Sequence, residues 1–160
     1  MDSTAKLYIN RAENEIVLAE KVKDMCDNNE VRNFMEIQSD MTFYSAVISH
    51  SYYAIFYSAK AILLTKSVKT DWPDVHRKTL DAFKEQFVDT GILDLKLLEI
   101  YKRMVVRADE LLQIFKNEKR KRGDFTYKTL PQANKEPAEE SVTNAKFFVS
   151  NVRKVMETIK

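Results

Sequence analysis

The sequence predicts an all-α protein, an up-and-down bundle of four long helices plus one short helix. Only two glycines and three prolines occur in 160 residues, too few for the many turns of an all-β fold. Apolar residues recur every three to four positions through four long segments, as in helices that bury one face. With 44% apolar and 31% charged residues the chain has a folded composition, and its length suits a single domain over residues 1–160.

The first two long helices are predicted from an amphipathic segment and from a mostly apolar one. Residues 2–4 offer N-cap oxygens for the first helix, which ends near residues 26–30. Its apolar or small stripe is Tyr8, Ala12, Ile16, Ala19 and Val22. Ser39 or Asp40 is expected to open the second helix, which has no acidic residue and is apolar around most of its circumference. Such a helix is buried on several sides, so it is expected to be central.

A short helix and two more long ones follow. The short amphipathic helix is expected over about 76–88. The next helix carries an apolar stripe from 98 to 115, runs into a basic stretch and ends by Gly123. Pro137 suits the first turn of the last helix. The inward stripe of that helix is predicted to be Val142, Ala145, Phe148, Val149, Val152 and Met156.

The sequence favours a cytoplasmic protein without a membrane segment or a cofactor. Cys26 is the only cysteine, so no disulfide can form within the chain, and a reducing compartment fits. The N-terminal segment carries charges throughout, and the longest apolar stretch, 59–64, is far too short to cross a bilayer. Because the net charge is only +2, an electrostatic binding site must come from local clustering.

One such cluster, Lys116, Lys119, Arg120, Lys121 and Arg122, lies at the end of the predicted third long helix. Two interpretations remain open. Cations at a helix C-terminus are stabilised by the helix dipole by roughly 0.3–1 kcal/mol each and need no ligand. The same cluster can bind phosphate, and the affinity would then fall steeply with salt.

The two histidines and the central aromatic residues also have a structural and a functional interpretation. His50 can be a hydrogen-bonded core residue, and His76 a cap or a surface residue. Two histidines without acidic or thiol partners nearby in sequence do not predict a metal site. Four aromatic residues can offer stacking surfaces for bases, or form core or dimer interface: Tyr52, Tyr53, Phe56 and Tyr57.

A longer pattern resembles a known family. The central segment reads SYYAIFYSAKAILL, and His76, the stretch FVDTGILD at 87–94, and Arg120, Asp124 and Phe125 follow in order. In order and spacing this is similar to the HEPN superfamily, in particular its small stand-alone proteins of the UPF0332 kind, over about residues 40–155. The resemblance implies a helical bundle that forms homodimers. Many members are metal-independent ribonucleases or RNA-binding modules, often toxins partnered by a minimal nucleotidyltransferase.

The family signature is an arginine four to six residues before a histidine, sometimes with a tyrosine two positions later. The resemblance places Arg120 at the arginine position and Tyr127 at the tyrosine position, while Phe125 occupies the histidine position or matches the tyrosine of an Asp-Tyr form. In an active nuclease, Arg120 and Tyr127 would be the catalytic residues. Helical periodicity instead favours Arg122, seven residues after Phe115 and in line with the apolar stripe. Both arginines remain candidates.

The chemistry of metal-free RNA cleavage favours binding over catalysis here. Cleavage needs a group that accepts the 2′-hydroxyl proton and a cation that holds the phosphorane charge. Arginine suits the second task. Phe125 suits neither, and a tyrosine with an ordinary pKa of about 10 is ionised in only about one molecule in a thousand at pH 7. The expected phosphate-binding residues are Lys119, Arg120, Lys121, Arg122 and Asp124, with Asp124 orienting the arginine or capping the next turn.

Three functions follow as hypotheses. The first is a HEPN-like homodimer that binds RNA or a nucleotide, with a nucleotidyltransferase as a partner protein. The second is a metal-independent endoribonuclease toxin whose proton transfers use Tyr127 or a histidine from elsewhere, His50 being preferred; Tyr53 and His76 are further site candidates. The third is a non-catalytic helical adaptor, which predicts a contiguous exposed apolar patch and no phosphate site.

Overall fold

The computed structural model describes residues 2–120 and 135–159, with side chains for all of these except 112–120. In the described part the long helices are α1 (Ser3–Asp27), α3 (Tyr44–Leu64), α5 (Leu95–Arg120) and α6 (Lys135–Thr158). The short ones are α2 (Asn29–Phe34), α4 (Val75–Phe83) and the π-helix η1 (Lys84–Val88). The predicted all-α bundle is confirmed. The helix expected over about 76–88 is α4 continued by η1, and α2 is a further short element.

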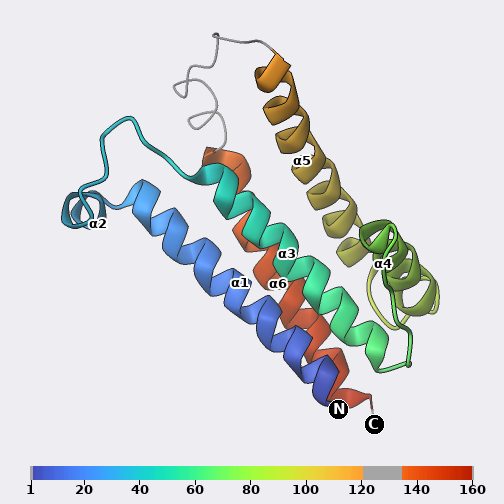
Figure 1. Cartoon of the computed structure of the whole chain (residues 1–160). Helices are drawn as coiled ribbons and strands as arrows, with labels where there is room; N and C mark the ends of the chain where they lie inside the picture. Colours follow the sequence, from blue (N-terminus) through green and yellow to red (C-terminus); the bar gives the residue numbers. More distant parts are fainter. Residues whose placement is uncertain (1, 121–134, 160) are drawn as a thin grey trace.

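The long helices alternate in direction, and α3 lies in the middle (Figure 1). It packs against α1 and α6 on one side and against α4 and α5 on the other. Because it has neighbours on most sides, its apolar residues are buried around most of its circumference, as its sequence predicted. Figure 1 also shows both termini at the same end of the bundle.

α3 begins later than predicted, and the connection from α1 explains why. The side chain of Asn28 accepts hydrogen bonds from the backbone N–H groups of Glu30 and Val31, which starts α2. The guanidinium of Arg32 then donates to the backbone carbonyls of Gln38 and Met41, at 2.6 and 2.8 Å. These bonds hold the chain in a loop, so the prediction that Ser39 or Asp40 opens the helix is wrong: α3 begins at Tyr44.

The core contains a cluster of aromatic rings, here called the buried ring cluster, made of Phe83, Phe87, Tyr101 and Phe148. All four are fully buried, and neighbouring ring centroids lie 5.2 to 6.4 Å apart. α4 and η1 form one continuous helical segment, which places Phe83 and Phe87 on the same inward face. The predicted stripe of α6 is confirmed, because all six of its residues are buried.

α5 is the most loosely held of the long helices. Its first half packs on the core, whereas its last turns extend beyond the neighbouring helices (Figure 1). Arg107 ties it to α6 by donating to Glu140 Oε2 at 3.0 Å and to Ser141 Oγ at 2.9 Å. Arg103 donates to the other oxygen of Glu140, at 2.7 Å. α5 is therefore fixed along one side, and a pocket opens on its other side.

Candidate functional site

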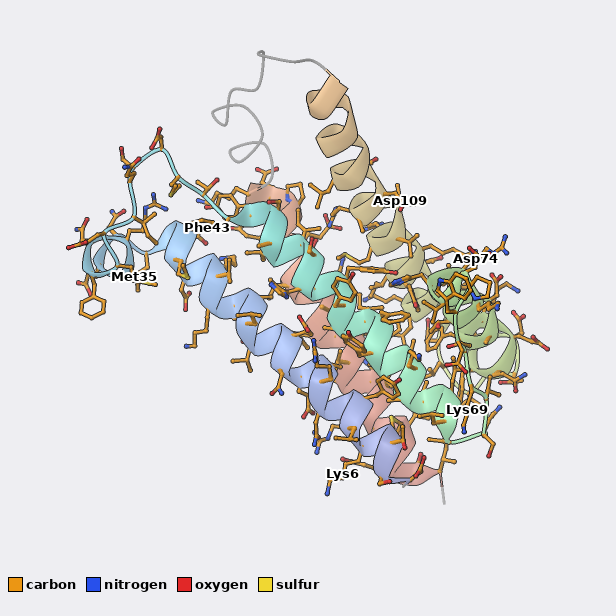
Figure 2. All side chains as sticks on the ribbon, viewed as in Figure 1. Lys6, Met35, Phe43, Lys69, Asp74 and Asp109 are labelled. Atoms are coloured by element: carbon orange, nitrogen blue, oxygen red, sulfur yellow. The ribbon has the colours of Figure 1, made fainter. Side chains whose placement is uncertain are left out.

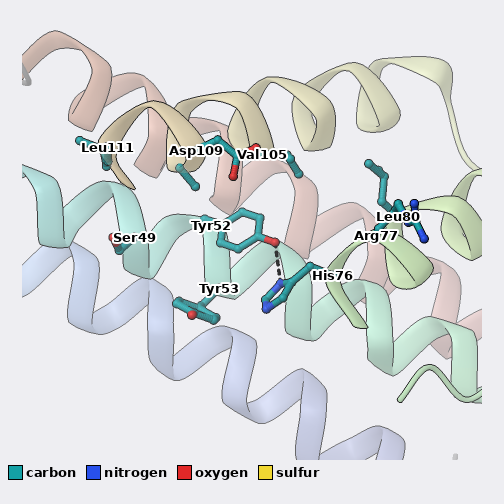
Figure 3. Close-up of a pocket in the computed structure, with 10 residues that line it drawn as sticks. Ser49, Tyr52, Tyr53, His76, Arg77, Leu80, Val105, Asp109 and Leu111 are labelled. Carbon is teal, nitrogen blue, oxygen red and sulfur yellow. Dashed lines mark hydrogen bonds between the residues drawn. The ribbon is translucent and has the colours of Figure 1, made fainter. Parts of the chain in front are cut away.

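A pocket of about 640 Å³ opens between α3, α4 and α5 (Figure 3). This volume is in the range that takes small ligands. Polar and aromatic side chains line it together with apolar ones: Ser49, Tyr52, Tyr53, His76, Arg77 and Asp109, with Leu80, Val105, Ala108 and Leu111.

Helical spacing explains why these residues meet. Ser49, Tyr52 and Tyr53 stand at positions i, i+3 and i+4 of α3, so they share one face. α4 begins directly after Asp74, which has a positive φ of 56° and turns the chain so that His76 lies in the first helical turn. The pocket thus gathers one face of α3 and the start of α4 from distant parts of the sequence.

His76 and Tyr52 form the polar centre of the pocket. The hydroxyl of Tyr52 lies 2.7 Å from Nδ1 of His76 (Figure 3). The imidazole also stacks on the ring of Phe56, with centroids 4.4 Å apart. Burial, and then the charge of Lys60, lower the pKa of His76, so the ring is neutral near pH 7.

The proton positions of this pair follow from its surroundings. Burial, Tyr53 and Asp109 raise the pKa of Tyr52 well above its ordinary value, so the phenol keeps its proton. A phenol O–H is a stronger hydrogen-bond donor than an imidazole N–H, and the basic nitrogen of a neutral imidazole is a stronger acceptor than a phenol oxygen, so the favoured arrangement of this pair has the phenol donating to Nδ1. The second ring nitrogen of His76, Nε2, then carries the proton. In this tautomer His76 is a hydrogen-bond donor to a ligand rather than a proton acceptor.

His50 lies outside this pocket, although it is on the same helix. Its Nδ1 is 2.6 Å from Oε2 of Glu15, a buried carboxylate on α1. The other oxygen of Glu15 accepts from Nε of Arg11 at 3.0 Å. His50 is thus part of a contact between α1 and α3, and the structure does not bring it together with His76.

The two tyrosines of the α3 motif differ in exposure. Tyr52 is buried, whereas Tyr53 is 39% exposed at the edge of the pocket. Phe56 is buried behind them, and Tyr57 is half-buried. These four aromatic residues of α3 therefore lie partly in the core and partly at the surface. Tyr53 is the most exposed of them, so a ligand in the pocket can contact its ring.

The basic cluster begins in the last turns of α5. Arg120 is the last residue of α5, preceded by Lys119, and the helix does carry the chain into the basic stretch. The side chains of both lie outside the described residues. So do five residues that follow in sequence: Lys121, Arg122, Asp124, Phe125 and Tyr127.

Arg77 and Asp109 are pocket residues that sequence reasoning missed. Arg77 follows His76 directly, so its position next to a candidate residue was a usable signal; it also lies 3.3 Å from Asp74. Asp109 gave no such signal, because only the packing of α5 brings it near Tyr52 (Figure 3). Among the described side chains, Asp109 has no ion-pair or hydrogen-bond partner.

The pocket can hold a planar, polar ligand of the size of a nucleobase. Tyr53 offers a partly exposed aromatic ring, His76 a ring N–H donor, and Asp109 a carboxylate acceptor. Across residues 2–111 and 135–159, no three histidine, cysteine or acidic side chains are grouped so as to hold a metal ion. The helices described here include none long and apolar enough to span a membrane.

Comparisons with known proteins point to one family. The sequence pattern of the HEPN domain matches residues 5–155. A protein of Methanocaldococcus jannaschii named as a candidate toxin (MJ0605) is 31% identical over 116 residues, which is 72% of this chain and 73% of that protein. A second candidate toxin of that organism (MJ0142) is 35% identical over 81 residues, 48% of this chain and 53% of its own length.

A third relative, named a UPF0332 protein, comes from Thermotoga maritima. It is 30% identical over 115 residues, 72% of this chain and 74% of its own length. The resemblance noted from the sequence is therefore confirmed on both the family and the branch. This chain belongs to the HEPN domain family.

Proposed function

We propose that this HEPN-family protein is a cytoplasmic homodimer that binds single-stranded RNA. In this proposal a base enters the pocket between α3, α4 and α5, and backbone phosphates bind Arg120 and the cations around it. The observation that carries the proposal is the pocket itself, where the exposed ring of Tyr53, the N–H donor of His76 and the carboxylate of Asp109 face one volume. Unstacked RNA bases are recognised by such combinations of aromatic faces and polar edges.

The residues at the end of α5 complete the proposed site. Arg120 is the principal phosphate ligand and Arg122 the alternative, with Lys119 and Lys121 adding charge. Asp124 orients the arginine through a charge-assisted hydrogen bond. A HEPN dimer brings two such ends into one assembly, so each RNA strand meets cations from α5 and a pocket on the bundle.

Binding to a labelled single-stranded RNA, followed by fluorescence anisotropy at low salt, tests this proposal. Arg120→Ala combined with Arg122→Ala is expected to weaken binding and to flatten its salt dependence. Ser49→Leu, which places a larger apolar side chain in the pocket, is expected to weaken binding without flattening the salt dependence.

Ser45→Leu is the matched control, because Ser45 is an exposed residue one turn earlier on the same helix and does not line the pocket. It should bind RNA as the unmodified protein does. Absence of RNA binding by the unmodified protein, or equal binding by all these variants, contradicts the proposal.

A metal-independent endoribonuclease toxin is the second candidate, favoured by the names of the two M. jannaschii relatives. Arg120 would stabilise the phosphorane, and Tyr127 or a histidine would accept the 2′-hydroxyl proton. His76 lines the pocket, but in the favoured tautomer its Nε2 carries the proton, so it would need the other tautomer to act as a base there. Incubating the protein with labelled RNA and EDTA decides the matter: cleavage supports the nuclease, and intact RNA after long incubation removes it.

A partner protein, such as a nucleotidyltransferase, is also part of the proposal. Three apolar residues around α2 are strongly exposed, Phe34 at 89% and Met35 and Met41 at 49% each. Figure 2 shows Met35 directly after α2, on the side of the bundle opposite α4 and α5. Affinity purification from the native host should recover a stoichiometric partner whose binding is lost in Phe34→Ser. Recovery of that partner without any RNA binding would favour the adaptor function instead.

A further inference from the structure

A row of tyrosines leads away from the pocket across α3 to α1. Tyr53 and Tyr57 on α3 stack with centroids 6.0 Å apart, and Tyr57 stacks on Tyr8 of α1 at 6.1 Å. The planes of each pair differ by less than 30°. We call Tyr53, Tyr57 and Tyr8 the tyrosine strip. It arises because positions i and i+4 of α3 face the same side, where α1 packs.

Each end of the tyrosine strip opens into a pocket. At one end Tyr53 lines the pocket that holds His76 and Asp109. At the other end Tyr8 lines a second pocket, of about 290 Å³, together with Lys60 and Lys69. One carboxylate, Asp71, also lines this second pocket. The strip is thus a continuous path between two concave sites.

Cations lie over two of the three rings of the strip. The guanidinium carbon of Arg11 lies 5.2 Å from the ring centroid of Tyr57, and Nζ of Lys60 lies 5.1 Å from that of Tyr8. Arg11 gives only Nε to Glu15 among the described residues, so its two terminal amino groups remain available to a ligand. Lys60 donates to the carbonyl of Thr70 at 3.0 Å, which fixes its position.

The hydroxyl groups of the strip are also open to a ligand. None of the three phenol oxygens has a hydrogen-bond partner among the described residues. Tyr8 and Tyr57 are half-buried and Tyr53 is exposed. Tyr57 stacks with both other rings and so presents its hydroxyl and ring edge, whereas Tyr53, at the end of the strip, stacks with only one ring of the strip. Tyrosine hydroxyls, arginine and lysine are the groups that commonly bind the phosphates of nucleic acids.

We propose that the tyrosine strip binds the sugar-phosphate backbone of the RNA strand whose base enters the α3–α4–α5 pocket, and carries it to the second pocket beside Lys69. Arg11 and the tyrosine hydroxyls bind the phosphates in this arrangement. The proposal rests on the proposed function, since it needs RNA in the first pocket. The proposal gives the RNA strand a direction across the bundle, from the first pocket to the second. The cations at the end of α5 do not define that direction by themselves.

The test is a salt titration of RNA affinity on four variants, read by anisotropy with a labelled single-stranded oligonucleotide. Arg11→Gln removes one phosphate contact, so affinity falls several-fold and the slope of log affinity against log salt decreases by about 0.7. Tyr57→Phe and Tyr53→Phe keep the rings and remove neutral hydrogen bonds, so each lowers affinity and leaves the slope unchanged.

Arg153→Gln is the matched control for Arg11→Gln. Arg153 is an exposed arginine on α6, paired with Glu13 and Glu157 as Arg11 is paired with Glu15, and its substitution changes the net charge equally. For Arg153→Gln the slope of log affinity against log salt should equal that of the unmodified protein. Thermal unfolding and the oligomeric state of each variant are measured alongside, because a change in dimerisation would point to a protein contact on the strip.

The outcomes separate this proposal from the function on which it rests. If RNA binding depends on Arg120 and Arg122 but is equal in Arg11→Gln and Arg153→Gln, the strip is not on the RNA path and the proposed function stands. If the strip variants change only dimerisation, the strip is a contact between copies and the proposal is overturned. If the unmodified protein binds no RNA, both proposals fall.

Discussion

The buried ring cluster and the tyrosine strip are built from the same kinds of side chain, yet they differ in how far their rings and hydroxyl groups are exposed to solvent. The rings of the cluster are fully buried, with Lys66 over Phe87 and with the hydroxyl of Tyr101 buried without a partner among the described residues. The rings of the strip are half-buried or exposed, carry open hydroxyls, and have Arg11 and Lys60 beside them. The first arrangement stabilises the bundle, whereas the second is suited to a charged ligand.

Substitution in the buried ring cluster should have the largest effect on stability. Phe148→Ala leaves a cavity beside the rings of Phe83 and Tyr101, so the free energy of unfolding should fall by about 3–5 kcal/mol. Urea denaturation measures this loss. The folded fraction of Phe148→Ala should bind RNA with the affinity of the unmodified protein. A loss of RNA binding larger than the unfolded fraction explains would mean that the buried ring cluster also contributes to RNA binding.

Substitution of the strip residue that reaches the pocket should show the reverse pattern. Tyr53→Leu keeps an apolar side chain on α3, so the stability should change by less than about 1 kcal/mol. The loss of base stacking and of the hydroxyl should weaken RNA binding by about 1–3 kcal/mol. Anisotropy and denaturation on the same sample measure both quantities. A stability loss as large as that of Phe148→Ala would place Tyr53 in the core instead.

The pH dependence of stability should report on His76. Burial and Lys60 lower its folded-state pKa below the ordinary 6.5, so the unfolded chain binds a proton more readily than the folded chain. The stability contributed by neutral His76 is therefore present above pH 6.5 and is lost as the pH falls through 6.5 toward the folded-state pKa.

His76→Gln should make the decline of the unfolding temperature in this acidic range shallower, which thermal scans at a series of pH values measure. Tyr52→Phe should keep most of the decline, because burial is the larger cause of the shift. An unaltered decline in His76→Gln would show that the imidazole is not held neutral by the pocket.

The smallest effect is expected from an exposed aromatic residue that belongs to neither region. Phe147 on α6 is 41% exposed, close to the value for Tyr53, and Nζ of Lys96 lies 4.6 Å from its ring centroid. Phe147→Leu should change stability by about 0.5 kcal/mol or less and leave RNA affinity unaltered. If Phe147→Leu lost RNA binding, any exposed aromatic ring beside a cation would be able to bind RNA, and the tyrosine strip would have no special role.

The sequence predicted the elements of the bundle better than it predicted the site. The long helices, the stripe of α6 and the extent of α4 with η1 follow from local periodicity, which a single chain displays directly. The start of α3 did not follow, because Arg32 captures carbonyls that lie beyond it in sequence. Here the hydrogen bonds of one side chain to carbonyls six and nine residues further along override the local signals for a helix start.

The site depends on contacts between residues far apart in the sequence, and the residues around each of them do not indicate these contacts. His76 and Tyr53 were candidates from the family pattern, but the hydrogen bond between His76 and Tyr52 joins residues 24 positions apart. Asp109 reaches the same pocket from α5, and the sequence around it reads as an ordinary helix surface. The pairing of His50 with Glu15 likewise appears only once α1 packs on α3. Periodicity assigns a face to each residue but does not say which faces meet.

Photochemical cross-linking of a single-stranded RNA to the intact protein, with mass-spectrometric mapping, tests most directly whether RNA lies on the pocket and the tyrosine strip. The prediction is that cross-linked peptides carry Tyr53 or Tyr57 of α3 and Tyr8 of α1, and that excess unlabelled RNA suppresses them. Cross-links confined to α6 around Phe147, or their absence from α1 and α3 under conditions where RNA is bound, would contradict it.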